Sequence, residues 1–309
     1  MRKEEKKRLD KIYKSSKLKP PYTNQSLAHR FWVFQNERVP LIVMLAIGLS
    51  ISVTLSKSSG NINWYATIIA TLMIVLYFLQ IRLADEPKDY EHDNQYYPNR
   101  PVQRGVITLK ELSQLKTTSI TCFFVLAALT GSIEVFLLAC LQQLYSYLTR
   151  HEFFMRNWLR KHFLIYQFSH YIQLLILDWL ILSVLRIQPL SQKLLFFVFI
   201  IIMIGMVEAS RTIGGTDGKA AKDRYSYILG INLALGSFVF LTIASAAYTA
   251  YLINHLVGNT KWFILIIGLT LVAWSVIKYK AKPTIKNAEI MNGTSLVMYL
   301  LAALTLYLK

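Results

Sequence analysis

Long apolar runs separated by short polar stretches make up most of this 309-residue chain. A run of about twenty apolar residues can cross the hydrocarbon of a bilayer, ~30 Å thick, as a helix. The pattern predicts nine membrane-spanning helices, at 39–56, 62–83, 118–131, 134–149, 164–185, 194–207, 226–253, 261–277 and 291–308. The third and fourth runs are nearly continuous and are separated only around Gly131 and Ser132. We therefore expect an all-α, polytopic membrane protein.

The distribution of Lys and Arg predicts its orientation, because positive loops are retained in the cytoplasm. With the N-terminus inside, the cytoplasmic segments hold 29 of the 34 Lys and Arg residues. The remaining five are Lys57, Arg186, Lys193, Lys261 and Lys309. We expect a multi-pass protein with a cytoplasmic N-terminus and an outer C-terminus, in the plasma membrane of a prokaryote.

Charge and composition refine this picture. Hydrophobic residues make up 54% of the chain, yet its formal net charge is +17. Residues 1–34 form a basic cytoplasmic segment ahead of a transmembrane domain at 35–309, and we interpret its lysines as topology signals that attract anionic headgroups. Nucleic acid is not an expected partner. Cys122 and Cys140 lie inside apolar runs, which indicates small packed residues instead of a disulfide.

A cluster of acids follows the second apolar run. Five carboxylates fall within nine residues: Asp85, Glu86, Asp89, Glu91 and Asp93. A spacing of four places Asp85, Asp89 and Asp93 on one helical stripe, with Glu86 beside them. Such oxygen ligands suit a hard divalent ion such as Mg²⁺. We predict a metal site at the cytoplasmic membrane surface; the alternative is an exposed acidic helix end.

Basic residues accompany the acids. Lys88 lies within the cluster, and Arg100 and Arg104 follow on a loop that contains Pro and Gly. Arginines bind phosphate oxygens in pairs, and a metal ion can bridge those oxygens, so the combination indicates a diphosphate site. Thr108 and Glu111 then fit a capping box, which predicts a short interfacial helix before the third span.

These motifs resemble a signature of the UbiA superfamily of intramembrane prenyltransferases, Asn-Asp-x-x-Asp-x-x-x-Asp followed by Arg-Pro-x-x-x-Gly. Asp85-Glu86-x-x-Asp89-x-x-x-Asp93 matches its spacing, with Asp85 in place of Asn and Glu86 in place of Asp. The segment from Arg100 to Gly105 matches the loop. The resemblance extends over residues 30–309.

This chain matches the second motif of the family less well than the first. After the sixth span the family usually has aspartates at a spacing of four, whereas this chain has Glu208-Ala209-Ser210-Arg211. Counting back from Gly230, Asp217 falls where the last aspartate would lie. Glu208 and Arg211 are on one helical turn and are suited to act as a ligand and a phosphate contact. The chain thus resembles a divergent branch with Asp-Glu-x-x-Asp and Glu-x-x-Arg motifs.

The resemblance implies Mg²⁺-dependent transfer of an isoprenoid group from a polyprenyl diphosphate to an aromatic or other lipophilic acceptor. The implied catalytic residues are Asp85, Glu86, Asp89 and Asp93, and the implied metal ligands are these four with Glu208 and Asp217. The implied diphosphate contacts are Lys88, Arg100, Arg104 and Arg211. An acceptor pocket is expected at Tyr166, His170 and Asn232, near the cytoplasmic ends of the fifth and seventh spans; a histidine bonded within the bundle is the alternative.

Two other functions stay open. A transferase of the same superfamily can use a polyprenyl phosphate as acceptor and a sugar diphosphate as donor. A transport or binding protein on this fold is suggested by the missing aspartates of the second motif and by Asp178 within the fifth span. A phosphatidyltransferase of the alcohol-transfer type is disfavoured, because its Asp-Gly-x-x-Ala-Arg signature is absent from the sequence.

Overall fold

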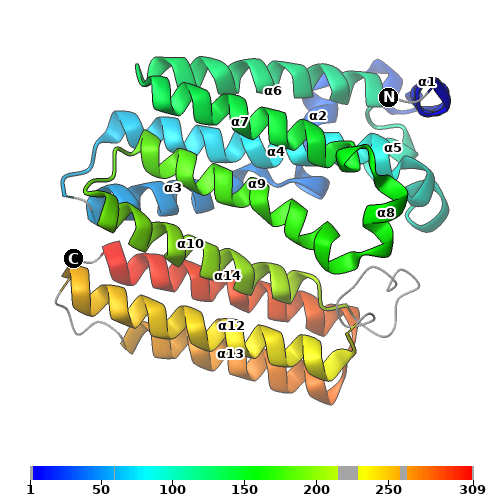
Figure 1. Ribbon diagram of the computed structural model, residues 1–309. Helices are drawn as coiled ribbons and strands as arrows, with labels where there is room; N and C mark the ends of the chain where they lie inside the picture. The colour runs from blue at the N-terminus through cyan, green and yellow to red at the C-terminus, as the bar shows by residue number, and fades with distance from the viewer. Residues whose placement is uncertain (1–2, 59, 215–228, 258–262, 308–309) are drawn as a thin grey trace. The chain divides into compact units, whose positions relative to one another are not determined.

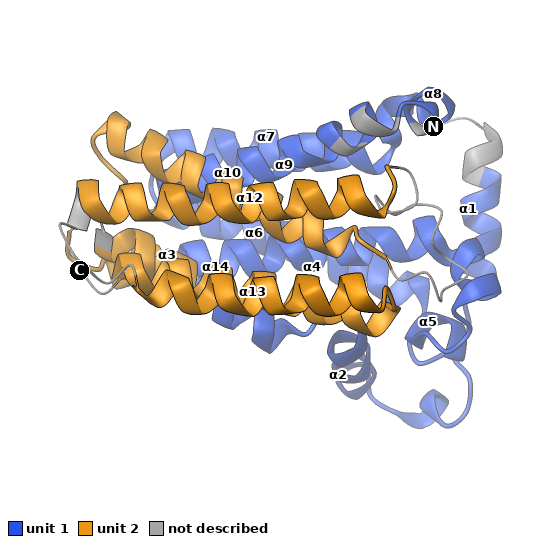
Figure 2. Ribbon diagram, turned by 90° about the horizontal axis from the view of Figure 1, so that it is seen from below, with its two compact units in different colours: residues 1–49, 68–184 blue, residues 50–67, 185–309 orange. Residues whose placement is uncertain are grey.

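The computed structural model describes residues 3–58, 60–214, 229–257 and 263–307, which form helices and connecting turns without a strand (Figure 1). The chain folds into two compact units (Figure 2). Unit 1 comprises residues 1–49 and 68–184, and unit 2 comprises residues 50–67 and 185–309. The predicted all-α class is confirmed.

Unit 1 carries the helices around the acidic cluster. In order they are α1 (Lys3–Ser15), η1 (Tyr22–Asn24), α2 (Leu27–Arg38), the start of α3 (Leu41–Ser58), most of α4 (Trp64–Tyr96), α5 (Pro101–Arg104), α6 (Leu109–Leu129), α7 (Ile133–Arg150), η2 (Glu152–Phe154), α8 (Arg156–Lys161) and α9 (Phe163–Val184). Unit 2 contains α10 (Leu190–Arg211), α12 (Ile231–Leu252), η4 (Ile253–Val257), α13 (Phe263–Ala281) and α14 (Ile285–Tyr307). Within unit 2, α10 packs on α12 and α13 packs on α14.

The acidic cluster lies on the last turns of α4, a helix of 33 residues that continues through Pro87. Proline inside a helix removes one backbone hydrogen bond, so packing must hold the helix together there. Leu83 and Tyr90 flank Pro87 and are both buried in one apolar core. That core is built from α1, α2, α4, α5 and the start of α6: Ile12, Phe34, Val39, Leu79, Leu83, Tyr90, Val102, Ile107, Leu109 and Leu112. Segments distant in sequence therefore fix the position of the acidic helix end.

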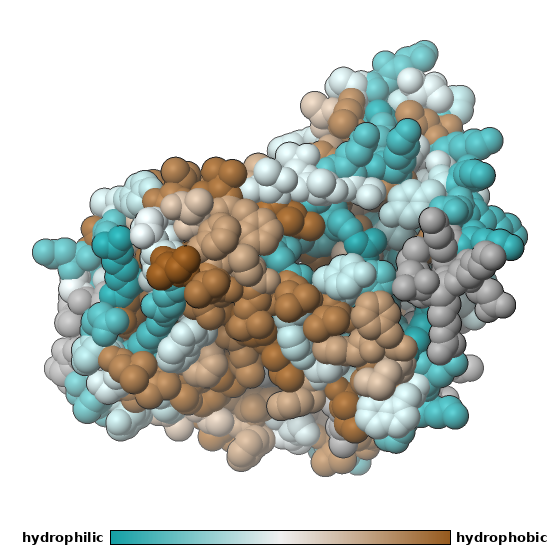
Figure 3. Space-filling model, turned by 45° about the horizontal axis from the view of Figure 1, so that its top comes forward, coloured by the Kyte–Doolittle hydropathy of each residue, from teal (hydrophilic) through white to brown (hydrophobic). Residues whose placement is uncertain are grey.

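Apolar helices support an integral, multi-pass membrane protein. Among the described residues, six helices are long and apolar enough to cross a membrane, or seven if α2 and α3, bent by 64°, count as one span. The predicted number of nine is therefore not confirmed. Helix α7 is not among the six, because Glu134, Gln142, Gln143 and Arg150 lower its mean hydropathy. The apolar part of α9, Phe168–Val184, is shorter than the six. Apolar side chains cover much of the face in Figure 3, as expected of helices that meet lipid.

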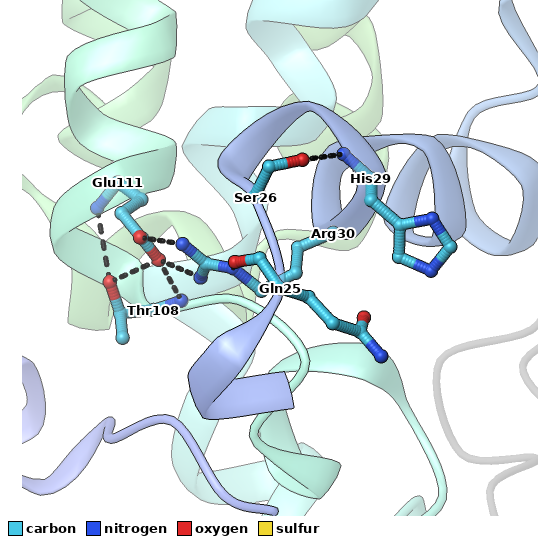
Figure 4. Close-up of polar contacts among 6 residues, drawn as sticks. All are labelled: Gln25, Ser26, His29, Arg30, Thr108 and Glu111. Carbon is cyan, nitrogen blue, oxygen red and sulfur yellow. Dashed lines mark hydrogen bonds and ion pairs between the residues drawn. The ribbon is translucent and has the colours of Figure 1, made fainter. Parts of the chain in front are cut away.

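Local capping signals set the ends of α6. Thr108 and Glu111 form the predicted capping box, and Arg30 of α2 binds the same glutamate (Figure 4). The expected short interfacial helix is not separate, because α6 runs without a break from Leu109 to Leu129. The predicted division after it is confirmed: Gly131 has a φ of +67°, and the Ser132 side chain caps α7.

Candidate active site

Two acids of the cluster are buried and held by arginines. Glu86 and Asp93 are each 1% exposed. Arg38 Nε and Arg82 Nη2 both lie 2.9 Å from Glu86 Oε1. Arg100 forms an ion pair with Asp93, and Arg38 Nη2 lies 3.8 Å from Asp93 Oδ2. A buried charge requires such partners, so these acids fix the arginines in place.

The electrostatics of Glu86 reflect this burial. Glu86 lies beyond the apolar part of α4, where burial raises the pKa of its carboxyl and Arg38 lowers it only in part, so the pKa stays above its ordinary value. Its second oxygen, Oε2, is buried and has no hydrogen-bond partner in the part of the chain that the structure describes. This oxygen is available to a further cation.

Asp89 differs from its neighbours on the stripe. Within the described residues, its carboxylate makes no ion pair, and the side chain is only partly buried. Burial raises its pKa, and the nearby cations Lys88 and Arg100 oppose that rise without cancelling it. A carboxylate beside two cations but paired with neither is available to an incoming ligand. Asp85 is likewise partly buried and does have a partner.

Lys88 connects the acidic helix to α9 and to the turn after α7. Its Nζ donates a hydrogen bond of 3.1 Å to Tyr166 Oη and lies 3.4 Å from Glu152 Oε1. Burial lowers the pKa of Lys88, but Tyr166, Asp85 and Glu152 together raise it above its ordinary value. Lys88 is therefore a cation at neutral pH, as a phosphate contact requires.

Glu152 was not predicted as a site residue. It is 3% exposed, lies between Lys88 and Arg156, and begins a turn in which Glu152, Phe153 and Phe154 all have a positive φ, of 49°, 52° and 59°. Left-handed conformations are costly for such residues and persist only where the surroundings impose them. Arg38 was also missed, because it lies 48 positions from Glu86 in the sequence. Arg82 was missed as well, although its spacing of four from Glu86 on α4 could have indicated the pair.

The predicted basic loop is built by α5 and Gly105. Gly105 ends α5 with a φ of +76°, and the N-terminal segment crosses it: Lys19 N donates to Gly105 O at 3.1 Å and Lys19 Nζ to Gln103 O at 2.9 Å. Arg104 pairs with Glu37 at 2.7 Å, away from the acids. Of the two loop arginines, only Arg100 contacts an acid of the motif.

Gly105→Ala is expected to destabilise unit 1 and loosen the N-terminal segment. A left-handed alanine costs about 1–2 kcal/mol, and its Cβ would lie 2.7 Å from Lys19 N. Thermal unfolding and amide exchange at Lys19 measure the two effects. Gly131→Ala is the matched control, since Gly131 also has a positive φ but nothing lies within 4 Å of the added Cβ. Equal destabilisation by both variants would show that the Lys19 contact adds nothing.

The remaining predicted residues divide between the units. In unit 1, the rings of Tyr166 and His170 lie 4.3 Å apart, and His170 Nδ1 lies 2.8 Å from Tyr166 O, so this nitrogen is bonded within its own helix. In unit 2, Glu208 and Arg211 pair with each other at the end of α10, and Asn232 is exposed on α12. Asp217 lies outside the described residues. The roles assigned to these unit 2 residues remain predictions.

The site offers carboxylate oxygens, which are the type of ligand that Mg²⁺ prefers. Among the residues that the structure describes, no three acidic, His or Cys side chains gather closely enough to hold a metal ion. The carboxylate of Asp89 and the unpartnered oxygen of Glu86 are nevertheless oxygen donors on adjacent faces of α4, the type that this ion prefers. Asp89 and Glu86 are the residues that would hold it.

Solved structures of similar fold exist. A digeranylgeranylglyceryl phosphate synthase of membranes has a TM-score of 0.57 with this chain, at 14% identity over 91% of this chain and 98% of its own. A UbiA homologue from Aeropyrum pernix K1 also has a TM-score of 0.57, at 15% identity over 84% and 96%. No protein-family model and no curated protein matches the sequence. At such low identity, the likeness establishes the fold.

Proposed function

Because the chain has the fold of UbiA homologues, we propose that it is an intramembrane transferase that moves a prenyl group from a polyprenyl diphosphate to a lipophilic acceptor. The observation that supports this most is Asp89, a carboxylate without an ion pair among the described residues, lying in the field of Lys88 and Arg100. An anion-binding group and an open carboxylate on one helix end suit a diphosphate bound with a divalent ion.

Each side chain has a defined task in this proposal. Lys88 and Arg100 bind the diphosphate and stabilise the charge that it gains as the allylic carbon–oxygen bond breaks. Glu86 and Asp93 hold Arg38 and Arg100 in position, and Asp89 with Glu86 would hold Mg²⁺. The bound ion would supply further charge neutralisation at the leaving group. Tyr166, bonded to Lys88, is the group of α9 that links the diphosphate contact to the predicted acceptor pocket.

The test is donor consumption by the purified protein in lipid nanodiscs. Labelled polyprenyl diphosphates of several chain lengths are supplied with aromatic and lipid-alcohol acceptors, and diphosphate release and label transfer are measured with Mg²⁺ and with EDTA. We expect turnover that requires the divalent ion. A parallel assay supplies a polyprenyl phosphate with a sugar diphosphate. Turnover in that assay alone would select the other transferase reaction, and no turnover in either assay would refute a transferase.

Asp178 supports a second candidate, a transport or binding protein. It is 4% exposed on α9, and neither carboxylate oxygen has a hydrogen-bond partner in the described part of the chain. Unpaired acids inside a membrane span are costly and often mark ion or proton paths. Cation flux in proteoliposomes that Asp178→Asn abolishes, without prenyl turnover, would favour this candidate over the transferase.

A further inference from the structure

An open groove of about 430 Å³ lies between α1 and the first half of α6, apart from the acidic cluster. Its lining contains hydroxyl groups, one amide and one ammonium group, and no carboxylate: Tyr13, Lys110, Ser113, Gln114, Thr117 and Thr118. Hydroxyl, amide and ammonium groups donate hydrogen bonds, and phosphate oxygens accept them. The chemistry of this lining therefore favours a phosphate-bearing ligand.

The groove lies at the polar end of α6, a helix long and apolar enough to cross a membrane. The residues of α6 that line it end at Thr118, and an apolar stretch begins at Ile120 and continues to Leu129. The transition from polar to apolar residues along a spanning helix marks the boundary between headgroups and hydrocarbon. A ligand in this groove would thus be in contact with the bilayer surface.

Helix α1, which contributes Tyr13 to the groove, also carries positive charge. Lys7, Lys11, Lys14 and Lys17 are exposed, and the spacing of the first three places them on one helical face. Lysines near an anionic membrane surface each contribute attraction, whereas a zwitterionic surface offers little. The charge of α1 and the donors of the groove are complementary to the same partner.

Other residues of α1 fasten it to the acidic end of α4. Arg8 donates to Glu91 Oε2 at 3.0 Å, Ser15 Oγ donates to Tyr90 Oη at 3.3 Å, and Ile12 is buried in the core beside Tyr90. Ser16 Oγ accepts a hydrogen bond from Leu109 N at 3.0 Å, where α6 begins. A ligand that holds α1 and α6 together therefore also supports the end of α4.

We propose that this groove binds the phosphate headgroup of an anionic phospholipid. Lys110 in the lining and the exposed Lys14, which follows Tyr13 on α1, supply charge. Tyr13, Ser113 and Thr118 supply hydrogen bonds, whereas the Thr117 hydroxyl donates to Ser113 O. The lipid steadies the segment of α4 that carries Tyr90 and Glu91. This proposal does not depend on the reaction that the protein catalyses, because it rests on a separate groove and on the surface of α1.

Binding is tested with the full-length protein and a photoactivatable phosphatidylglycerol, in nanodiscs of phosphatidylcholine with a minority of phosphatidylglycerol. The Lys14→Gln/Lys110→Gln variant is expected to lose roughly fivefold in labelling affinity per lysine, the equivalent of about 1 kcal/mol each at an anionic surface. The control, Lys280→Gln/Lys286→Gln, removes the same charge from exposed lysines of unit 2 and is expected to label like the wild type. A groove variant that labels like the wild type, or no worse than the control, would overturn the proposal.

A second measurement tests the coupling to α4. In the wild type, phosphatidylglycerol is expected to slow amide hydrogen exchange at Tyr90 and Glu91 relative to pure phosphatidylcholine, and the groove variant should lose this difference. Both lysines are exposed, so the variant should fold normally, which its melting temperature in detergent verifies. Equal exchange in the two lipid mixtures would show that a bound lipid does not support the helix end.

Discussion

Asp89→Asn is expected to lower prenyl turnover at least about a hundredfold, the loss typical of removing one preorganised electrostatic group from a transition state. Asparagine keeps the shape of the side chain and one oxygen but removes the negative charge. Because the carboxylate of Asp89 makes no ion pair among the described residues, the substitution leaves no cation without its partner. The loss should appear in kcat and in the Mg²⁺ concentration needed for half-maximal rate, while the melting temperature changes little.

Glu91→Gln provides the matched control for this prediction. Glu91 lies two residues further along the same helix, but its side chain is 56% exposed and paired with Arg8. Removing its charge changes the net charge of the motif by the same amount. Its turnover is expected to stay close to that of the wild type. A comparable loss in both variants would indicate a general effect of charge, and full activity of Asp89→Asn would exclude Asp89 from the site.

Local sequence signals predicted the acidic helix end well. The spacing of four from Asp85 to Asp93 belongs to a continuous helix, and the capping box at Thr108 and the break at Gly131 are formed as expected. These features depend on residues within one or two turns of each other. The helical stripe of acids was therefore predictable. Which of these acids pair with arginines, and which makes no ion pair, was not.

The pairing of each acid depends on contacts between distant segments. Arg38 reaches Glu86 across 48 positions of sequence, and Arg8 reaches Glu91 across 83. Arg82 and Glu86 follow the helical spacing of four, but no spacing rule relates Arg38 to Glu86 or Arg8 to Glu91. Sequence alone therefore could not separate the acids that hold arginines from the acid without an ion pair. The positive φ angles of the three residues that begin at Glu152 could not be predicted from the sequence either. None of the three is glycine, and tertiary packing imposes their conformation.

Arg30→Met is expected to destabilise unit 1 by about 3–5 kcal/mol, the range for breaking a buried ion pair by removing one partner. Arg30 Nη1 and Nη2 donate to the two oxygens of Glu111 at 2.8 and 2.6 Å, and the two side chains are only 7% and 20% exposed (Figure 4). The variant leaves the carboxylate of Glu111 without its cation. Thermal and denaturant unfolding in detergent measure the loss.

The same pair joins three parts of unit 1, which distinguishes it from an ordinary surface contact. Arg30 Nε also donates to Gln25 O at 3.1 Å, and Glu111 Oε2 also accepts from Thr108 N at 2.9 Å, so one variant loosens the start of α2 and the cap of α6 together. Arg8→Met is the control, because the pair of Arg8 with Glu91 is exposed and such pairs contribute about 0–1 kcal/mol. In the double variant Arg30→Met/Glu111→Gln, no buried carboxylate is left without a cation. Part of the lost stability should therefore return, although the cap of α6 stays weakened. Equal losses for Arg30→Met and Arg8→Met would mean that the buried pair does not join these segments.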